Sequence, residues 1–392
     1  MMGGVMLKRV CGVARRECGI LRRNNMYLFC MVLFPVIVTL FFTSLMSNGQ
    51  PTDMPVGVVD LDNTPTTRAM IRKLDAFQST KVTGRYTDVA AARRAIQRNE
   101  IYAFLYIPKG TTSELLSMRQ PKISFYYSTA SYTAGALLYR DLKTIATLGS
   151  ASVGASLLSA KGLTEEQVMS FLQPVVVDLH MVNNPAANYS VYLNTMLIPG
   201  CLMLFIFLLT AYSLGTELKF NTAREWISSS GDNIFVALVG KLIPQTLVFL
   251  AIIYLYMFYV FHVLNFPHPG GVGYMLMLGL LTVLSSQGFG VFVFGIVPSL
   301  RMSMSICCLW AVLSYSLSGT AFPLSAMDSE LRAIALLFPL RHYYMIYQLN
   351  IFNGYPVSYS LPYVVALIMF AALPLLVAKR IKRNVLTYQY LP

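Results

Sequence analysis

Long apolar runs are distributed unevenly along this chain, with one near the N-terminus and five in a close-set group in the C-terminal half. Each run is long enough to cross a bilayer as a helix, which takes about 20 residues. The runs cover 26–46, 192–214, 234–264, 274–297, 302–322 and 361–378. This pattern predicts an α-helical integral membrane protein with six transmembrane helices.

The stretch 47–191, between the first and second runs, has a different periodicity. Short strands alternate there with amphipathic helices. Thr64 with Pro65, and later Asp88, have the residue types that begin helices, and Thr164 opens a further helix with a capping-box pattern. Strands are expected at 56–59, 81–86, 101–107, 122–127 and 175–181. The stretch is therefore predicted to form an α/β extracytoplasmic domain inserted between transmembrane helices 1 and 2.

Composition agrees with a membrane protein, because 56% of the residues are hydrophobic and 12% are charged, against roughly 25% charged in a soluble protein. The net charge of +13 resembles that of a nucleic-acid-binding protein, but the basic residues gather at the edges of the apolar runs, so no nucleic-acid partner is expected. They are Lys8, Arg9, Arg15, Arg16, Arg22 and Arg23 before the first run, and Lys379, Arg380, Lys382 and Arg383 after the last. The positive-inside rule then places both termini in the cytoplasm.

The two ends of the chain have separate expected roles. Residues 1–25 are predicted to form a cytoplasmic amphipathic helix that contacts anionic membrane lipid, and 379–392 a cytoplasmic tail. A cleaved signal peptide is the competing interpretation of the first run, but 26–46 exceeds the usual 7–15 apolar residues and no small-x-small site follows. The run 26–46 is therefore interpreted as an anchor.

Cysteine and histidine indicate no additional chemistry. The stretch 47–191 contains no cysteine, so no disulfide framework is expected there. The four histidines do not have the spacing of a zinc site, which needs three or four clustered ligands. They are His180, His262, His268 and His342. No metal site and no bound cofactor are expected.

The sharpest local motif is Val59-Asp60-Leu61-Asp62-Asn63-Thr64, at the end of an expected strand. It resembles the nucleophile motif of haloacid-dehalogenase-type phosphatases, in which the first carboxylate attacks phosphorus and both carboxylates help to hold magnesium. Such a phosphatase also needs a downstream lysine and a second acidic pair at a strand end, whereas the pair Glu165-Glu166 falls in an expected helix. The favoured interpretation is a strand-to-helix junction in which Asp62 or Thr64 caps the helix.

The sequence contains no Gly-x-x-x-x-Gly-Lys-Ser/Thr, so ATP-driven transport would require an ATPase in a separate chain. The candidate docking element is the cytoplasmic segment 217–230, in which Phe220, Ala223 and Ile227 are predicted to share one helical face. A membrane-surface helix should be rich in Lys and Arg, but this segment balances them with Glu. The alternative is an interfacial helix with Trp226 at the level of the lipid headgroups.

The order of these features resembles the permeases of the ABC type-2 transporter family, in particular exporter subunits with a large periplasmic domain. The resemblance is carried by the stretches 215–217, 222–226, 240–244 and 318–323, with Met327 and Pro339 beyond them. It implies a coupling helix at 217–230 that presses on an ABC ATPase, and a pair of short outer-leaflet helices within 323–347. The expected coupling residues are Glu217, Phe220, Thr222, Arg224, Glu225 and Trp226.

Polar residues within the apolar runs are candidates for the translocation pathway, because they should turn away from lipid. They are Asn194, Ser314, Tyr315, Ser316 and Ser318. The alternative, that the serines only pack helices together, stays open. Lys241, in the third run, would cost about 2.5–3.5 kcal/mol at the middle of the bilayer, so it is expected to extend to the cytoplasmic edge.

The sequence thus predicts the transmembrane permease subunit of an ATP-driven ABC exporter in a bacterial inner membrane. The expected partners are ABC ATPase subunits, which use ATP and Mg, and a second permease chain, identical or related. The outside domain is a candidate surface for a periplasmic adaptor protein. The alternative function is a membrane-anchored extracytoplasmic phosphatase or signalling receptor. The sequence leaves the substrate open among lipids, drugs, peptides and glycans.

Overall fold

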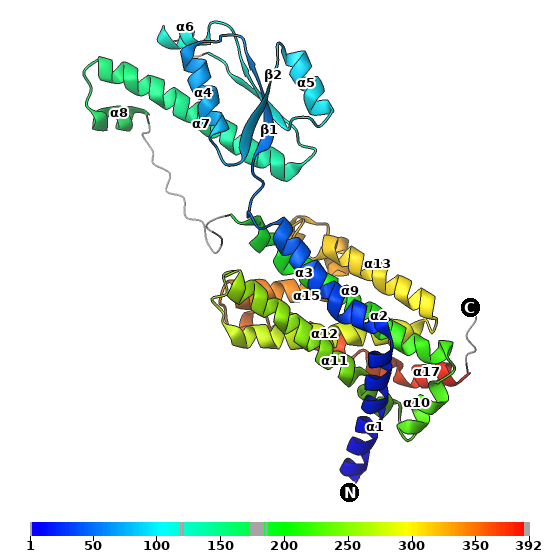
Figure 1. The fold of residues 1–392 in the computed structure, drawn as a ribbon. Coiled ribbons are helices and arrows are strands. Elements are labelled where there is room, and N and C mark those ends of the chain that lie inside the picture. The colour runs from blue at the N-terminus through cyan, green and yellow to red at the C-terminus, as the bar shows by residue number, and fades with distance from the viewer. Residues whose placement is uncertain (1, 118, 120, 173–183, 185–186, 388–392) are drawn as a thin grey trace. The chain divides into compact units, whose positions relative to one another are not determined.

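The computed structural model describes all residues except 1, 118, 120, 173–183, 185–186 and 388–392 (Figure 1). The chain divides into two compact units, one made of Met1–Ser47 with Val182–Pro392 and the other of Asn48–Met181. The described residues contain six helices that are long and apolar enough to cross a membrane. These are Asn25–Leu45, Tyr189–Lys219, Ile234–Val263, Val272–Ile296, Leu300–Leu317 and Leu361–Thr387. The six predicted membrane helices are therefore confirmed as helices of suitable length and composition.

Several of these six helices are built from more than one regular segment. The first joins α2 (Asn25–Leu28), a π-helical turn and α3 (Phe34–Leu45). The second is the single helix α9 (Tyr189–Lys219), and the third is α11 (Ile234–Phe258) with a π-helical turn. The remaining helices are α12 (Val272–Ile296), α13 (Leu300–Leu317), and α16 (Leu361–Ala372) followed by α17 (Pro374–Thr387). The predicted runs underestimated the helices mainly at the C-terminal ends of α9 and α17, where charged residues continue each helix.

Helix α9 lies at the centre of this unit and packs along both α12 and α13 (Figure 1). Close approach depends on small residues, as in other membrane helix pairs. A Cβ atom at Gly290 of α12 would lie 2.9 Å from the Cβ of Thr210, and one at Gly200 of α9 would lie 2.5 Å from the Tyr315 ring. These two contacts fix α9 against its two main neighbours.

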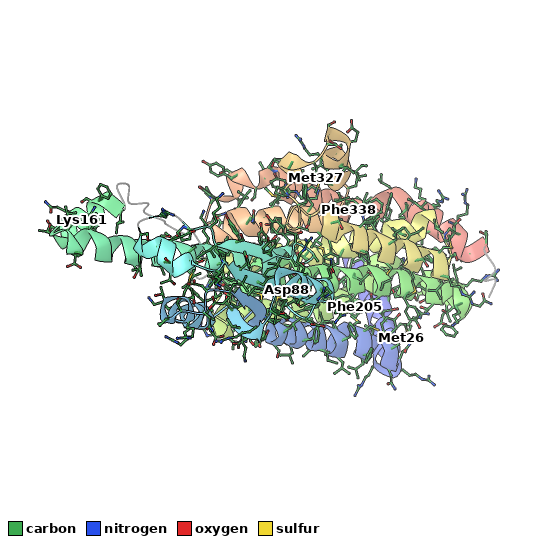
Figure 2. All side chains as sticks on the ribbon, turned by 90° about the horizontal axis from the view of Figure 1, so that it is seen from above. Met26, Asp88, Lys161, Phe205, Met327 and Phe338 are labelled. Atoms are coloured by element: carbon green, nitrogen blue, oxygen red, sulfur yellow. The ribbon has the colours of Figure 1, made fainter. Side chains whose placement is uncertain are left out.

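Shorter helices complete the unit. Helix α1 (Met2–Arg23), which corresponds to the predicted N-terminal helix, packs against α11 with Val13 and Glu17 buried. Helix α10 (Ala223–Ser229) follows α9. After α13 come α14 (Ser329–Ala335) and α15 (Pro339–Ile346), the two short helices that the resemblance implied. Figure 2 shows Met327 and Phe338, which flank α14.

The unit Asn48–Met181 contains a four-stranded sheet with the strand order β2-β1-β3-β4. Strand β1 (Met54–Asp60) lies parallel to β2 (Thr80–Arg85) and to β3 (Ala103–Ile107), and β4 (Ser124–Tyr127) is antiparallel to β3. The parallel pairs require crossover connections, which here are helices. The helices of this unit are α4 (Pro65–Asp75), α5 (Val89–Gln97), α6 (Thr111–Leu116), α7 (Tyr132–Ala160) and α8 (Glu165–Leu172).

Helices cover both faces of this sheet, because successive side chains of a strand point to opposite sides. Val56 and Val58 of β1 pack with residues of α4 and α7, whereas Val59 packs with Ala92 and Ala95 of α5. The predicted caps are confirmed: Thr64 forms a capping box at α4, and the Asp88 side chain accepts a hydrogen bond from the Ala91 N–H at α5. The predicted strand 175–181 lies outside the described residues.

Candidate functional site

A cluster of buried charged side chains lies where α9 and α11 meet α1. Lys241 of α11 is 1% exposed, and its Nζ donates a hydrogen bond to Glu217 Oε1 of α9 at 2.7 Å. The same Nζ donates to both carboxylate oxygens of Glu17 of α1, at 2.8 and 2.9 Å. Glu17 and Glu217 are themselves buried. One ammonium group therefore joins carboxylates from two other helices.

Glu217 accepts hydrogen bonds from two further side chains, one in α1 and one in the turn that follows α9. Arg16 of α1 donates to its two oxygens at 2.8 and 3.0 Å, the bidentate geometry in which guanidinium and carboxylate interact most strongly. Thr222, the N-cap residue of α10, donates its hydroxyl to Glu217 Oε2 at 2.5 Å. Through this one carboxylate, Glu217 connects α9 with Lys241 of α11, Arg16 of α1 and the start of α10.

The four charges of this cluster, Arg16, Glu17, Glu217 and Lys241, balance one another. Pairing is required because an isolated buried charge costs several kcal/mol. Burial raises the pKa of Glu17 against the opposing effect of Lys241. Burial opposes the charge of Arg16 as well, but the hydrogen bond and charge of Glu217 outweigh it and raise the pKa of Arg16. The cluster is therefore stable only while its partners stay together.

Lys241 was expected to extend to the cytoplasmic edge, where its ammonium would meet water; the contact with water was wrong, and its depth in the membrane stays a prediction. Its side chain is enclosed, and the ammonium also lies 5.3 Å from the centre of the Trp226 ring, within cation–π distance. Two carboxylates within hydrogen-bond distance make contact with water unnecessary. Sequence reasoning missed Glu17, although an acidic residue in the otherwise basic stretch 1–25 was a usable signal.

The expected single coupling helix over 217–230 was also wrong. Helix α9 continues to Lys219, Asn221 adopts a positive φ of 55°, and α10 begins at Ala223. Asparagine tolerates this left-handed conformation, which stops the first helix. Phe220 is consequently 64% exposed and does not share the buried face of Ala223 and Ile227.

Helix α10 has a buried face and an exposed face. Trp226 is 0% exposed, and its Nε1 donates a hydrogen bond to the Ala237 carbonyl at 3.2 Å, so its ring is enclosed by protein and is not exposed on the surface of the unit. Arg224 and Glu225 are exposed, with 71% of the Glu225 side chain accessible. Among the expected coupling residues, Glu217 and Trp226 thus fix α10 from inside, and Phe220, Arg224 and Glu225 are accessible to another molecule.

Most of the chain matches a known protein family. The model of the family described as ABC-2 family transporter protein matches residues 26–379. The chain belongs to the ABC-2 transporter family. Membrane proteins of this family generally work with ABC ATPases. The comparison with curated proteins finds no match.

The five candidate pathway residues of this ABC-2 transporter differ in their contacts. Tyr315, near the end of α13, and Ser318, the residue after it, both contact α9. The Tyr315 hydroxyl donates to the Leu197 carbonyl at 3.3 Å, and Ser318 Oγ contacts Met196 Sδ at 3.0 Å. Asn194 is buried and donates a hydrogen bond to the Phe42 carbonyl of α3.

The other two pathway candidates are placed differently. The Ser314 hydroxyl donates to the Ala311 carbonyl within α13, and Ser316 is exposed. A serine bonded to its own helix backbone is satisfied without a ligand. Tyr315 and Ser318 therefore tie α13 to α9, and the pathway role of all five residues stays a prediction.

The Asp60-x-Asp62 motif of this ABC-2 transporter forms a structural junction. Asp60 Oδ1 accepts hydrogen bonds from the N–H groups of Asp62 and Asn63, and its Oδ2 accepts from the Thr67 hydroxyl. Asp62 accepts from the Gly110 and Thr112 N–H groups at the start of α6, at 2.8 and 3.1 Å. Both carboxylates are thus occupied by the protein, so the phosphatase alternative has no support from this geometry.

The Asp62 carboxylate acts as a cap for α6 from a neighbouring loop. Hydrogen bonds, above all from the Thr112 hydroxyl, hold the pKa of Asp62 below its usual value. The sequence prediction named Asp62 or Thr64 as the cap of the helix that follows them. Thr64 caps that helix, and Asp62 instead binds the helix that begins at Thr111. No group of three or more His, Cys, Asp or Glu side chains suited to a metal ion occurs among the described residues.

Proposed function

We propose that this chain is the transmembrane permease subunit of an ATP-driven exporter, and that it works as a dimer with an identical or related chain. The support is its ABC-2 family membership, its six candidate membrane helices and the lack of a P-loop in its sequence. ATP and Mg are used by separate ABC ATPase subunits. The ATPases close on ATP, and this movement rocks the membrane helices and opens a route outward.

The observation that carries this proposal is the position of Glu217 beneath α10. Its carboxylate is bonded to Arg16, Lys241 and Thr222, so it links α10 to α1, α9 and α11. A force applied to the exposed face of α10 therefore reaches three helices through short, charged hydrogen bonds. Helix α10 is the coupling element in this proposal, with Phe220, Arg224 and Glu225 as the contact residues for the ATPase.

The proposed orientation follows from the basic residues at the two ends of the chain. Helices α1, α10 and the end of α17 lie at the cytoplasmic side of a bacterial inner membrane. The unit Asn48–Met181 is then extracytoplasmic, where it offers a surface to a periplasmic adaptor protein. Helices α14 and α15 lie in the outer leaflet.

A cross-linking experiment tests the ATPase partnership. The tagged full chain, carrying a photoreactive group on a cysteine at Ser228, an exposed residue of α10, is purified from its native membrane. We expect it to capture a P-loop ATPase, and the matched variant at Ser113, an exposed residue of α6, to capture none. Absence of an ATPase from the purified complex, or equal capture from both positions, would contradict the proposal.

A further inference from the structure

Arg341, in the first turn of α15, is a partly buried cation without a carboxylate partner among the described residues. Its Nη1 donates a hydrogen bond to the Ser318 carbonyl at 2.8 Å. Its Nε is buried and has no hydrogen-bond partner within the described part of the chain. The two carboxylates of the same segment, Asp328 and Glu330, are exposed. The Nε edge of this guanidinium is therefore unoccupied by protein acceptors.

The backbone around Arg341 is shaped to accommodate the guanidinium. Gly319 has a positive φ of 95°, and a Cβ atom there would lie 2.5 Å from Arg341 Nη1. Any other residue would collide with the guanidinium and strain the backbone. The backbone of the turn after α13 thus lies directly against the Nη1 side of the Arg341 guanidinium. The Nε side has no hydrogen-bond partner among the described residues.

The neighbouring side chains that oppose the effect of burial on Arg341 are two tyrosines and not carboxylates. Tyr344 and Tyr363 lie within electrostatic range of Arg341. Burial raises the pKa of Tyr344 to about 12, so the phenol stays protonated, and it accepts a hydrogen bond from Gln348 Nε2 at 2.6 Å. Its own proton is then available to an acceptor outside this pair.

The paired cations of the same unit show what Arg341 lacks. Arg16 is bound by both oxygens of Glu217, and this raises its pKa against burial. Burial lowers the pKa of Arg341, with only the two tyrosines opposing it. A guanidinium cannot lose its proton in a protein to avoid this cost, and a charge that is partly removed from water is stabilised by a counter-ion. No carboxylate of the described residues supplies this counter-ion, so an anionic group on another molecule is the partner that the guanidinium can accept.

We propose that Arg341 binds an oxyanion, a phosphate or carboxylate group, on the molecule that this transporter exports. This inference rests on the proposed export function. The Nε edge of an arginine presents two parallel donors that match two oxygens of such a group. Ser318, which holds Nη1, also contacts Met196 of α9, so the anion site adjoins the α9–α13 contact that contains the candidate pathway residues. The same chemistry fits the headgroup of a resident anionic lipid.

The test measures binding by the full chain, purified in a neutral detergent without any ATPase. The melting temperature is followed during titration with a short-chain phosphatidylglycerol, with the uncharged diacylglycerol of the same chain length, and with inorganic phosphate. We expect phosphatidylglycerol to raise the melting temperature saturably and diacylglycerol to leave it unchanged. An equal rise in melting temperature with inorganic phosphate assigns the site to free anions. A rise with phosphatidylglycerol alone assigns it to an anionic group attached to an apolar molecule.

Three variants decide whether Arg341 is responsible. Arg341→Gln should weaken apparent phosphatidylglycerol affinity about 10- to 100-fold, the range for losing a charged hydrogen bond. Arg341→Lys, which retains the charge but loses the planar fork, should weaken it less. Arg332→Gln removes an exposed arginine of α14 and should bind like the wild type.

The proposal is overturned if the wild type responds to no anion, or if Arg341→Gln responds as the wild type does. If Arg341→Gln fails to elute as a single species, the decision passes to Arg341→Lys, for which unchanged affinity overturns the proposal. Because no ATPase is present, a negative result removes the anion site without affecting the permease proposal, which the Ser228 cross-link tests separately.

Discussion

Glu17 and Lys241 form a buried ion pair across 224 positions of the sequence, with Lys241 Nζ 2.8 and 2.9 Å from the two carboxylate oxygens. This pair holds α1 against α11. Glu217 extends the same cluster to α9 and to the first residue before α10. The coupling helix of the proposed exporter is therefore attached to the membrane helices through buried ion pairs, which are energetically unfavourable to separate.

The first prediction concerns the stability of this cluster. Lys241→Met should lower the free energy of unfolding by about 3–5 kcal/mol, because it leaves two carboxylates buried without their shared cation. Glu17→Gln should cost less, since Lys241 retains Glu217 and burial already opposes the charge of Glu17. Lys219→Met, at an exposed lysine, is the control. Thermal unfolding of the full chain in detergent measures all three, and equal effects of Lys241→Met and Lys219→Met would refute the cluster's role.

A second prediction concerns pH and Asp62. Hydrogen bonds led by that of Thr112 lower the pKa of Asp62 from 3.8, so its contribution to stability is present above pH 3.8 and is lost as the pH falls through the lower folded-state pKa. Hydrogen exchange, corrected for the intrinsic rate, should show protection of the Gly110 and Thr112 amides falling in that window. Asp62→Asn should abolish this pH dependence. An identical pH profile in both proteins would show that another group is responsible.

Third, the unit Asn48–Met181 should not hydrolyse phosphate esters. Asp60 is occupied by the Asp62 and Asn63 N–H groups and by Thr67, and cannot at once serve as a nucleophile. Asp60→Asn should leave transport largely intact. The measurement is magnesium-dependent phosphate release by the purified chain, with transport assayed in parallel. Release that disappears in Asp60→Asn would restore the phosphatase alternative.

The fourth prediction is topological. Ser113 is exposed in the unit Asn48–Met181, and the native Cys18 is exposed on α1. A membrane-impermeant thiol reagent applied to intact cells should label a cysteine at Ser113 but label Cys18 only after the membrane is opened, because the positive-inside rule predicts that α1 is cytoplasmic. Variants that carry one accessible cysteine at a time provide the comparison. Labelling of both sites in intact cells would contradict the six-span arrangement.

Features set by neighbouring residues were predictable from the sequence. The six membrane helices follow from the length of each apolar run, and the caps Thr64 and Asp88 depend on residues three positions away. The ion cluster was not predictable in this way, because hydropathy shows Lys241 only as a charge in an apolar run. Its partner Glu17 is 224 positions away. The break before α10 depends on the positive φ of Asn221, which the helical spacing of Phe220 and Ala223 concealed.

The central claim is that the exposed face of α10 receives the movement of an ATPase. Glu225→Lys reverses a charge on this face and removes the exposed ion pair between Glu225 and Arg16 (3.6 Å), while the hydrogen bonds from Arg16 and Lys241 to Glu217 remain. Folding should survive, since an ion pair with an exposed carboxylate contributes only about 0–1 kcal/mol to stability. Glu330→Lys, at an exposed glutamate of α14, is the matched control.

The deciding measurement is the ATPase activity and the recovery of the reconstituted complex for the wild type, Glu225→Lys and Glu330→Lys. We predict that Glu225→Lys loses transport and shows either weaker ATPase association or no stimulation of ATP hydrolysis by substrate, whereas Glu330→Lys retains all three. A well-folded Glu225→Lys protein with unchanged association and unchanged stimulation would contradict the account and leave α10 as a helix without a coupling role.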